Sequence, residues 1–150
     1  MRLIQQTDEH YEFELSSREK VLLFQVLELY PQVPGGYQHL SKTADPEEAN
    51  QRLLEETLSE TRAQNKRALQ QMLTDPNKLS SSDTQWRLHL SSAELDWLLA
   101  VLNDIRIGSW VRLGSPEVPL AVLTAGNASY YWALEMAGYF QGGFLELLER

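Results

Sequence analysis

The chain has 150 residues and a formal net charge of −8, from 13 lysines and arginines against 21 aspartates and glutamates. Such an acidic surface repels a phosphate backbone, so the sequence disfavours nucleic-acid binding. It contains no cysteine, which excludes disulfides and thiolate chemistry and removes the commonest ligand of structural zinc. With 43% hydrophobic and 23% charged residues, the composition is that of one folded domain.

The first predicted element is a strand over residues 11–15, in which apolar and acidic residues alternate as they do in a half-buried strand. Residues 3–6 could pair with it across a short turn. Ser16 and Glu19 then stand three positions apart, which is the spacing of a capping box, so we expect a leucine-rich helix to begin there. The prolines and glycines of residues 31–36 end this helix.

A long helix is predicted to begin at Pro46, because Asp45 and Glu48 form a capping box around it. The next helix-breaking pair starts at Asp75, so the helix would have about 28 residues and a length of about 42 Å. One seam of this helix is apolar at its ends and polar in its middle. We expect the polar middle to leave the core. The seam consists of Leu54, Leu58, Thr61, Asn65, Ala68 and Met72. Residues 74–84, rich in turn formers, are predicted as an exposed connector.

The sequence around Phe13 recurs at Leu88, 75 positions later, with matching serines, glutamates and leucines. This similarity predicts two strand–helix–loop–helix halves, residues 11–73 and 86–148, related by a pseudo-twofold within a single domain of residues 1–150. Two unrelated capped helices with leucine-rich faces would align equally well, so chance similarity is the alternative.

The strands at residues 11–15 and 86–90 could pair as a small sheet under the helices. The second capped helix is predicted over residues 92–107, ending near Gly108, and the last helix over residues 127–148. The predicted fold class is therefore mainly α, a four-helix arrangement built from the two halves with a minor, small β-sheet.

All four tryptophans lie in the second half of the chain, and aromatic residues open its last helix. Aromatic residues dominate both cores and interface hot spots, so this asymmetry indicates either a better-packed half of the core or a binding surface. Glycines four positions apart in the same helix would allow another helix to approach closely, within one subunit or across a homodimer. The candidate interface consists of Tyr130, Tyr131, Trp132, Gly138 and Gly142.

Arg106 is predicted on an apolar helix face, one turn from Asn103. A buried guanidinium needs a partner, and Glu135 is the candidate, in which case the pair would tie the last two helices together. The functional alternative is that Arg106, Trp110 and Arg112 bind a carboxylate or phosphate, which suit a guanidinium. These five residues form the candidate binding or structural network.

The sequence predicts no catalytic site, no metal site and no cofactor. His10, His39 and His89 lack the i+4 spacing of a helical metal site, and no nucleotide-binding or nucleophile-elbow motif occurs. No stretch is long and apolar enough for a membrane-spanning helix or a signal peptide. We therefore expect a cytoplasmic protein that is not an enzyme.

The run LNDIRIGSWVRLG, residues 102–114, together with YYWALEMAGYFQGGFLELL, residues 130–148, resembles the C-terminal half of an uncharacterised family of small bacterial proteins, a domain of unknown function. That family also opens with a short strand pair and a capped leucine-rich helix. The resemblance implies a cytoplasmic helical protein. Some of its relatives are labelled as transcriptional regulators or are encoded near the adaptor of the Clp protease. It implies no catalytic residues.

These patterns favour a non-enzymatic protein-interaction or regulatory module, which binds a protein partner or self-associates as a homodimer through the surface between its last two helices. One alternative is a small-molecule or anion-binding protein that uses Arg106 and Arg112 with the surrounding aromatic residues. The other is a transcriptional regulator, against which the acidic balance argues.

Overall fold

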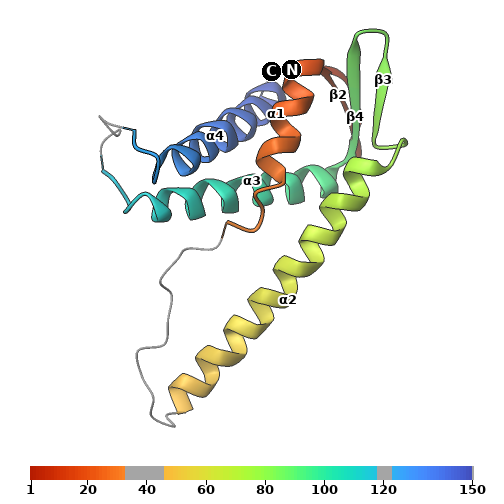
Figure 1. Ribbon diagram of the computed structural model, residues 1–150. Coiled ribbons are helices and arrows are strands. Elements are labelled where there is room, and N and C mark those ends of the chain that lie inside the picture. Colours follow the sequence, from red (N-terminus) through yellow and green to blue (C-terminus); the bar gives the residue numbers. More distant parts are fainter. Residues whose placement is uncertain (33–45, 118–122, 150) are drawn as a thin grey trace.

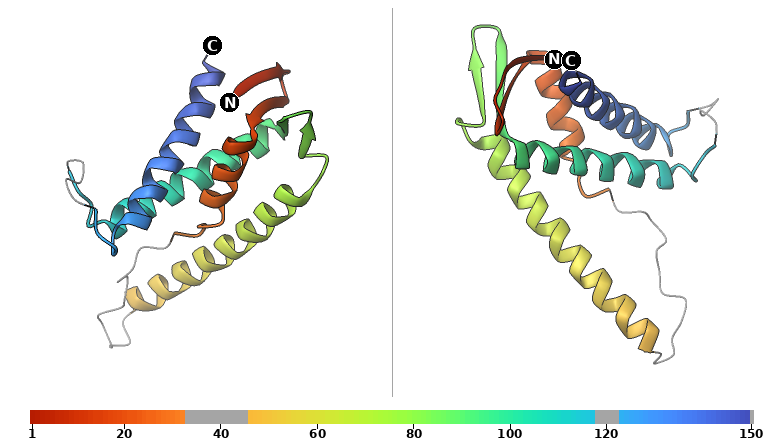
Figure 2. Two further views of the ribbon diagram at one scale, coloured as in Figure 1. Left: turned by 45° about the horizontal axis from the view of Figure 1, so that its top comes forward. Right: turned by 180° about the vertical axis from the view of Figure 1, so that it is seen from behind.

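The computed structural model describes residues 1–32, 46–117 and 123–149. Figures 1 and 2 show the arrangement of its helices and strands. In chain order these are β1 (Arg2–Gln6), β2 (His10–Ser16), α1 (Ser17–Leu27), α2 (Pro46–Thr74), β3 (Leu79–Ser82), β4 (Gln85–Ser91), α3 (Ser92–Arg112) and α4 (Ala128–Leu148). None of the described helices is both long enough and apolar enough to cross a membrane.

The four strands form one antiparallel sheet in the order β1–β2–β4–β3. Two hairpins, β1–β2 and β3–β4, meet where β2 pairs with β4. Alternation along the two central strands sends Phe13, Leu15, Leu88 and Leu90 into the core, where each is at most 1% exposed. The charged residues between them point to the opposite face of the sheet.

The predicted fold class is wrong. Helices take 62% and strands 18% of the described chain, and the strands form a four-stranded antiparallel sheet, so the protein is a mixed α/β fold. The prediction missed β3, which lies in the serine-rich stretch interpreted as a connector. Its single apolar residue, Leu79, is buried and pairs with Leu88. One apolar residue in four is too weak a pattern to indicate a strand.

The capping boxes predicted at the starts of α1 and α3 are confirmed, whereas the one predicted at Asp45 and Glu48 involves Asp45, which lies outside the described residues. The hydroxyl of Ser16 accepts a hydrogen bond from the backbone N–H of Glu19 at the start of α1, and Ser91 accepts one from Glu94 at the start of α3. Each glutamate also binds an ammonium group, the amino terminus for Glu19 and Nζ of Lys78 for Glu94. Burial raises the pKa of both carboxyls, but these hydrogen bonds and charges outweigh it, so each pKa lies below its usual value.

The register of the sheet places Phe13 directly opposite Leu88, the two residues that an offset of 75 positions relates. A twofold axis between them would exchange β2 with β4 and α1 with α3, and the matching capping boxes fit this symmetry. The helices differ in length, however, since α1 has 11 residues and α3 has 21. The internal repeat over residues 11–73 and 86–148 stays a prediction.

α3 runs past its predicted end near Gly108 and continues to Arg112. A Cβ atom at Gly108 would lie 1.8 Å from the backbone oxygen of Gln32. This glycine therefore allows the chain after α1 to cross α3 closely and does not end the helix.

The core lies between the sheet and the helices α1, α3 and α4. α3 and α4 pack side by side (Figures 1 and 2), and Ala133 and Ala137 of α4 are fully buried. Phe144 of α4 reaches the sheet and packs edge-on against Phe13, with their ring centroids 5.0 Å apart. The last helix is thus a core element over much of its length.

α2 meets the rest of the fold near β3 and diverges from α3 toward its own amino-terminal end (Figures 1 and 2). Leu69 and Met72, near its carboxyl end, are buried. In its middle, the side-chain Nδ2 of Asn65 donates to the hydroxyl of Tyr30 at 3.0 Å, and its Oδ1 accepts from Nε1 of Trp97 at 3.0 Å. The expectation that this polar middle leaves the core is confirmed for Thr61, which is exposed, but it is wrong for Asn65, which anchors the helix there.

Candidate protein interface

The amino-terminal half of α2 carries three largely exposed leucines. Leu53, Leu54 and Leu58, which we call the leucine patch, are 62%, 58% and 42% exposed. Leu54 and Leu58 share one side of the helix because they stand four positions apart. Single exposed leucines are ordinary on a protein surface, but three within two helical turns form a cluster of the kind that marks an interaction site.

A depression of about 250 Å³ lies where α2 and α3 diverge, next to the leucine patch. Leu58 and the half-exposed Ile107 of α3 line its apolar part, whereas Arg62 and Asp104 line its polar part. Burial raises the pKa of the Asp104 carboxyl, and the nearby Arg62 guanidinium partly opposes this rise. The depression thus extends the leucine patch toward α3 and gives it a charged rim.

The chain that follows α1 holds α2 at its middle. The hydroxyl of buried Tyr30 accepts from Asn65, and Nζ of Lys66 donates to the backbone oxygen of Glu28 at 2.9 Å. Gln32, in the same stretch, donates from its amide to the hydroxyl of Ser109 on α3 at 3.3 Å. These bonds connect the carboxyl-terminal half of α2 to α1 and α3, and the leucine patch lies beyond them.

The charge of α2 changes sign at its middle. Residues 46–60 contain five glutamates and one arginine, a net charge of −4, whereas residues 61–74 contain two arginines, one lysine and no acidic residue, a net charge of +3. The helix dipole favours acids in the first turn and bases in the last turn. Glu55, Glu56 and Glu60 lie beyond the first turn, and the last turn holds no basic residue. The dipole therefore does not explain this division.

The predicted network around Arg106 has a different arrangement. Oδ1 of Asn103 accepts a hydrogen bond from the guanidinium of Arg106 at 3.0 Å and another from the amide of Gln141 on α4 at 3.4 Å. Arg106 and Glu135 are both exposed, and within the described ranges no ion pair joins them. Asn103 and Gln141 thus form a polar link between α3 and α4.

Trp110 and Arg112, near the end of α3, make separate contacts. The indole N–H of Trp110 donates to the backbone oxygen of Pro116 at 3.0 Å, and the guanidinium of Arg112 lies 5.7 Å from the ring centroid of Tyr130. Six positions separate Arg106 from Arg112, a rotation of about 240° around the helix. Their guanidinium groups therefore do not converge, and the three described depressions are lined by other residues.

The residues of the predicted α4 interface are dispersed. Tyr130, Tyr131 and Trp132 are each partly buried, and Trp132 packs against the core. A Cβ atom at Gly138 would lie 3.9 Å from the aliphatic part of Arg106, and one at Gly142 would meet nothing within 4 Å. Within the described chain, neither glycine therefore serves a close helix–helix contact. The surface between the last two helices is itself part of the core.

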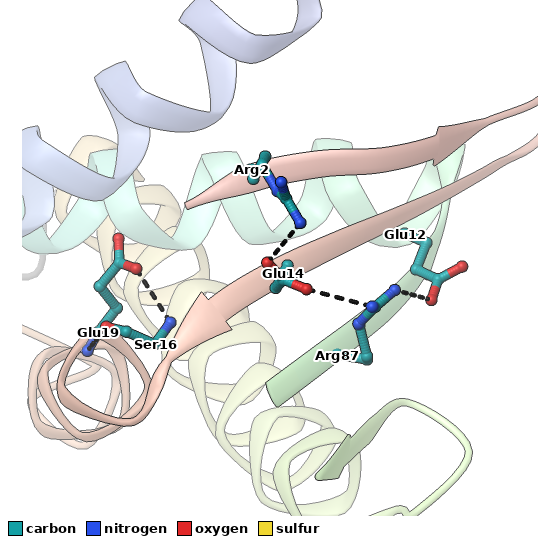
Figure 3. A network of polar contacts seen from close by, with 6 residues as sticks. All are labelled: Arg2, Glu12, Glu14, Ser16, Glu19 and Arg87. Atoms are coloured by element: carbon teal, nitrogen blue, oxygen red, sulfur yellow. Dashed lines mark hydrogen bonds and ion pairs between the residues drawn. The ribbon is translucent and has the colours of Figure 1, made fainter. Parts of the chain in front are cut away.

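Ion pairs cross the charged face of the sheet (Figure 3). Glu14 pairs with Arg2 at 2.9 Å and with Arg87 at 3.1 Å, and Arg87 also pairs with Glu12 at 3.0 Å. The neighbouring depression contains His89, whose Nε2 is 4.0 Å from Glu12. In the part of the chain that the structure describes, no group of three or more histidine, aspartate or glutamate side chains could hold a metal ion. Since these opposite charges pair with one another, we interpret the cluster as structural.

From the sequence, Leu54 and Leu58 were predicted to lie on one face of a helix, at the apolar end of a seam directed toward the core. A repeating seam of apolar residues predicts the direction of a helix face, and it carries no signal for how far along the helix the core extends. The change of charge sign at residues 60–61 was the available clue.

Comparisons with known proteins identify no relative. No protein-family model matches the chain, and neither a curated protein nor a solved structure matches it. The resemblance to the uncharacterised bacterial family stays a prediction.

Proposed function

We propose that this chain is a non-enzymatic protein-interaction or regulatory module, and that it binds its partner through the leucine patch and the adjoining depression. One observation carries the proposal. α2 is anchored at Asn65, yet Leu53, Leu54 and Leu58 of the same helix remain 62%, 58% and 42% exposed.

The free energy available at this surface supports the proposal. Full burial of a leucine side chain stabilises by roughly 1.5–3 kcal/mol, so covering three leucines that are about half exposed would contribute roughly 2–5 kcal/mol. Ile107, on the other side of the depression, would add to this contribution. An apolar centre with the charged groups of Arg62 and Asp104 at its rim is the usual composition of a protein interface.

The alternatives have less support. An anion site built from Arg106 and Arg112 would need their guanidinium groups to converge, and these lie on different sides of α3. A transcriptional regulator that contacts DNA directly would need a basic surface, whereas the chain has a net charge of −8. A cytoplasmic location remains part of the prediction from sequence.

Site-specific photo-crosslinking in cells tests the proposal. A photoreactive amino acid in place of Leu54 should give a covalent adduct with another protein chain. The matched control is the same amino acid in place of Leu145 of α4, which is 43% exposed and lies outside the leucine patch. An adduct from position 54 but not from position 145 would support the proposal. Absence of any adduct from position 54, with the protein folded and abundant, would contradict it.

A further inference from the structure

We propose that the partner that covers the leucine patch is a second copy of this chain, with the two α2 helices crossing antiparallel about a twofold axis. This inference rests on the proposed function, because both use the leucine patch. It adds the identity of the partner, the orientation of the two helices and the residues that select that orientation.

The charge of α2 selects a reversed second copy. Residues 46–60 carry a net charge of −4 and residues 61–74 carry +3, so an antiparallel pair sets each acidic half beside a basic half. A parallel pair would instead set acidic beside acidic and basic beside basic. In a chain with a net charge of −8, two copies repel each other in most orientations, and the basic half of α2 offers a complement to its acidic half.

The position of the leucines agrees with this charge pattern. Residue 56 lies midway between Leu54 and Leu58, and in an antiparallel pair that crosses there, residues equally far from 56 meet. Arg62 and Lys66 lie about 9–15 Å from that midpoint toward the carboxyl end, at 1.5 Å per residue. The exposed Glu47 lies about 14 Å from it toward the amino end, whereas the neighbouring Glu48 is buried and pairs with Arg52 of its own helix. Crossing at the leucines thus brings Glu47 of one copy to the level of the bases of the other.

The crossing also gives the exposed leucines apolar neighbours. Leu54 of one copy would contact Leu58 of the other. The twofold axis generates the same contact a second time, so both copies use the same surface. Asn65 and the residues near it already connect the other half of α2 to α1 and α3. The amino-terminal half diverges from α3 (Figures 1 and 2), and the exposure of its leucines makes them accessible to a second helix.

Charge reversal with mixing tests the proposal. In the first variant, Glu55→Lys, Glu56→Lys and Glu60→Lys change the acidic half from −4 to +2. In the second variant, Arg62→Glu, Lys66→Glu and Arg67→Glu change the basic half from +3 to −3. Each variant alone then has two halves of the same sign and should repel itself. An equimolar mixture restores opposite signs across the pair and should form a heterodimer.

Sedimentation velocity of the full chain is the readout. We expect the wild type to sediment as a species of about 34.4 kDa, twice the 17.2 kDa of one chain. For each variant alone, we expect the dissociation constant of the dimer to rise at least about tenfold. The mixture should recover the dimer. The control variant, Asp8→Lys, Glu9→Lys and Glu117→Lys, makes the same change of net charge as the first variant at exposed sites outside α2 and should stay dimeric.

A variant without charge changes tests whether loss of the dimer could result from misfolding. Leu54→Ser with Leu58→Ser changes only exposed side chains, so circular dichroism should remain that of the wild type while the protein becomes monomeric. A monomeric wild type at concentrations up to about 100 μM would overturn the inference, and so would a mixture of folded charge variants that stays monomeric.

Crosslinking separates failure of this inference from failure of the proposed function. An adduct of 34.4 kDa from position 54, twice the mass of one chain, supports self-association. An adduct of another mass with a monomeric wild type overturns self-association and leaves the interaction module standing. No adduct at all from position 54 overturns both.

Discussion

Replacing Asn65 with alanine should loosen α2 and lower the stability of the whole fold. The side-chain amide of Asn65 donates to the hydroxyl of Tyr30 and accepts from the indole N–H of Trp97, both at 3.0 Å. Tyr30 is only 3% exposed, so its hydroxyl would lose a partner at a place that water reaches poorly. α2 would then keep Leu69 and Met72 as its buried contacts.

The size of the effect follows from the two bonds. A hydrogen bond of this kind contributes about 0.5–1.5 kcal/mol, and leaving a buried polar group without a partner costs about 1–3 kcal/mol. Trp97 is partly exposed, which reduces its share because water can replace the lost acceptor. We therefore expect a loss of about 2–3 kcal/mol, and for a chain of this length a fall in Tm of about 4–12 °C.

Thermal unfolding followed by circular dichroism measures the change, with Gln64→Ala as the matched control on an exposed position of the same helix. The control should stay within about 0.5 kcal/mol of the wild type. Hydrogen exchange should quicken in α2 of the Asn65→Ala variant and stay unchanged in α4. A Tm equal to that of the control would refute the claim that Asn65 anchors the helix.

Three further outcomes follow from the packing and the charges. Gly108→Ala should lower Tm in thermal unfolding, because its Cβ would meet the backbone oxygen of Gln32, whereas Gly142→Ala, in open space, should stabilise by roughly 0.5–1 kcal/mol. Equal effects of the two changes would contradict this. Because the pKa of Glu94 lies below its usual 4.5, its ionised form stabilises the fold above that value, and this contribution is lost as pH falls through the folded pKa. The difference in denaturant stability between wild type and Glu94→Gln should thus shrink below about pH 4.5, and a constant difference would exclude this linkage. Leu54→Ser with Leu58→Ser should change the unfolding free energy of the dissociated chain by less than about 1 kcal/mol, and a larger loss would mean that these leucines belong to the core.

Features that depend on near neighbours in the chain were predictable from the sequence. At the starts of α1 and α3 the serine and glutamate are three positions apart, so their hydrogen bonds require only a local helical turn, and these two capping boxes formed as predicted. The pairing of β2 with β4 was also predictable, since each has two core-facing leucine or phenylalanine side chains in alternation.

Features that depend on distant parts of the chain were not predictable in this way. Gly108 resembles a helix end, and its true role appears only beside Gln32, which comes from a different helix connection. Arg106 had a plausible acidic partner in Glu135, but its guanidinium instead donates a hydrogen bond to Asn103, one turn away. In the sequence, Asn65 looks like a polar interruption of the apolar seam of α2. In the structure, its amide nitrogen donates to Tyr30 and its amide oxygen accepts from Trp97, two residues far away in the chain.

The leucine patch is best explained by the unequal lengths of α1 and α3. α4 lies along α3, which has 21 residues, and there it buries Ala133 and Ala137. In the predicted internal repeat, these correspond to Leu58 and Arg62 of α2, 75 positions earlier. α1, which would be the counterpart of α3 in that repeat, ends after 11 residues, so among the described elements the amino-terminal half of α2 has no long helix of its own chain beside it. A reversed second copy of α2 would take the place of that missing helix.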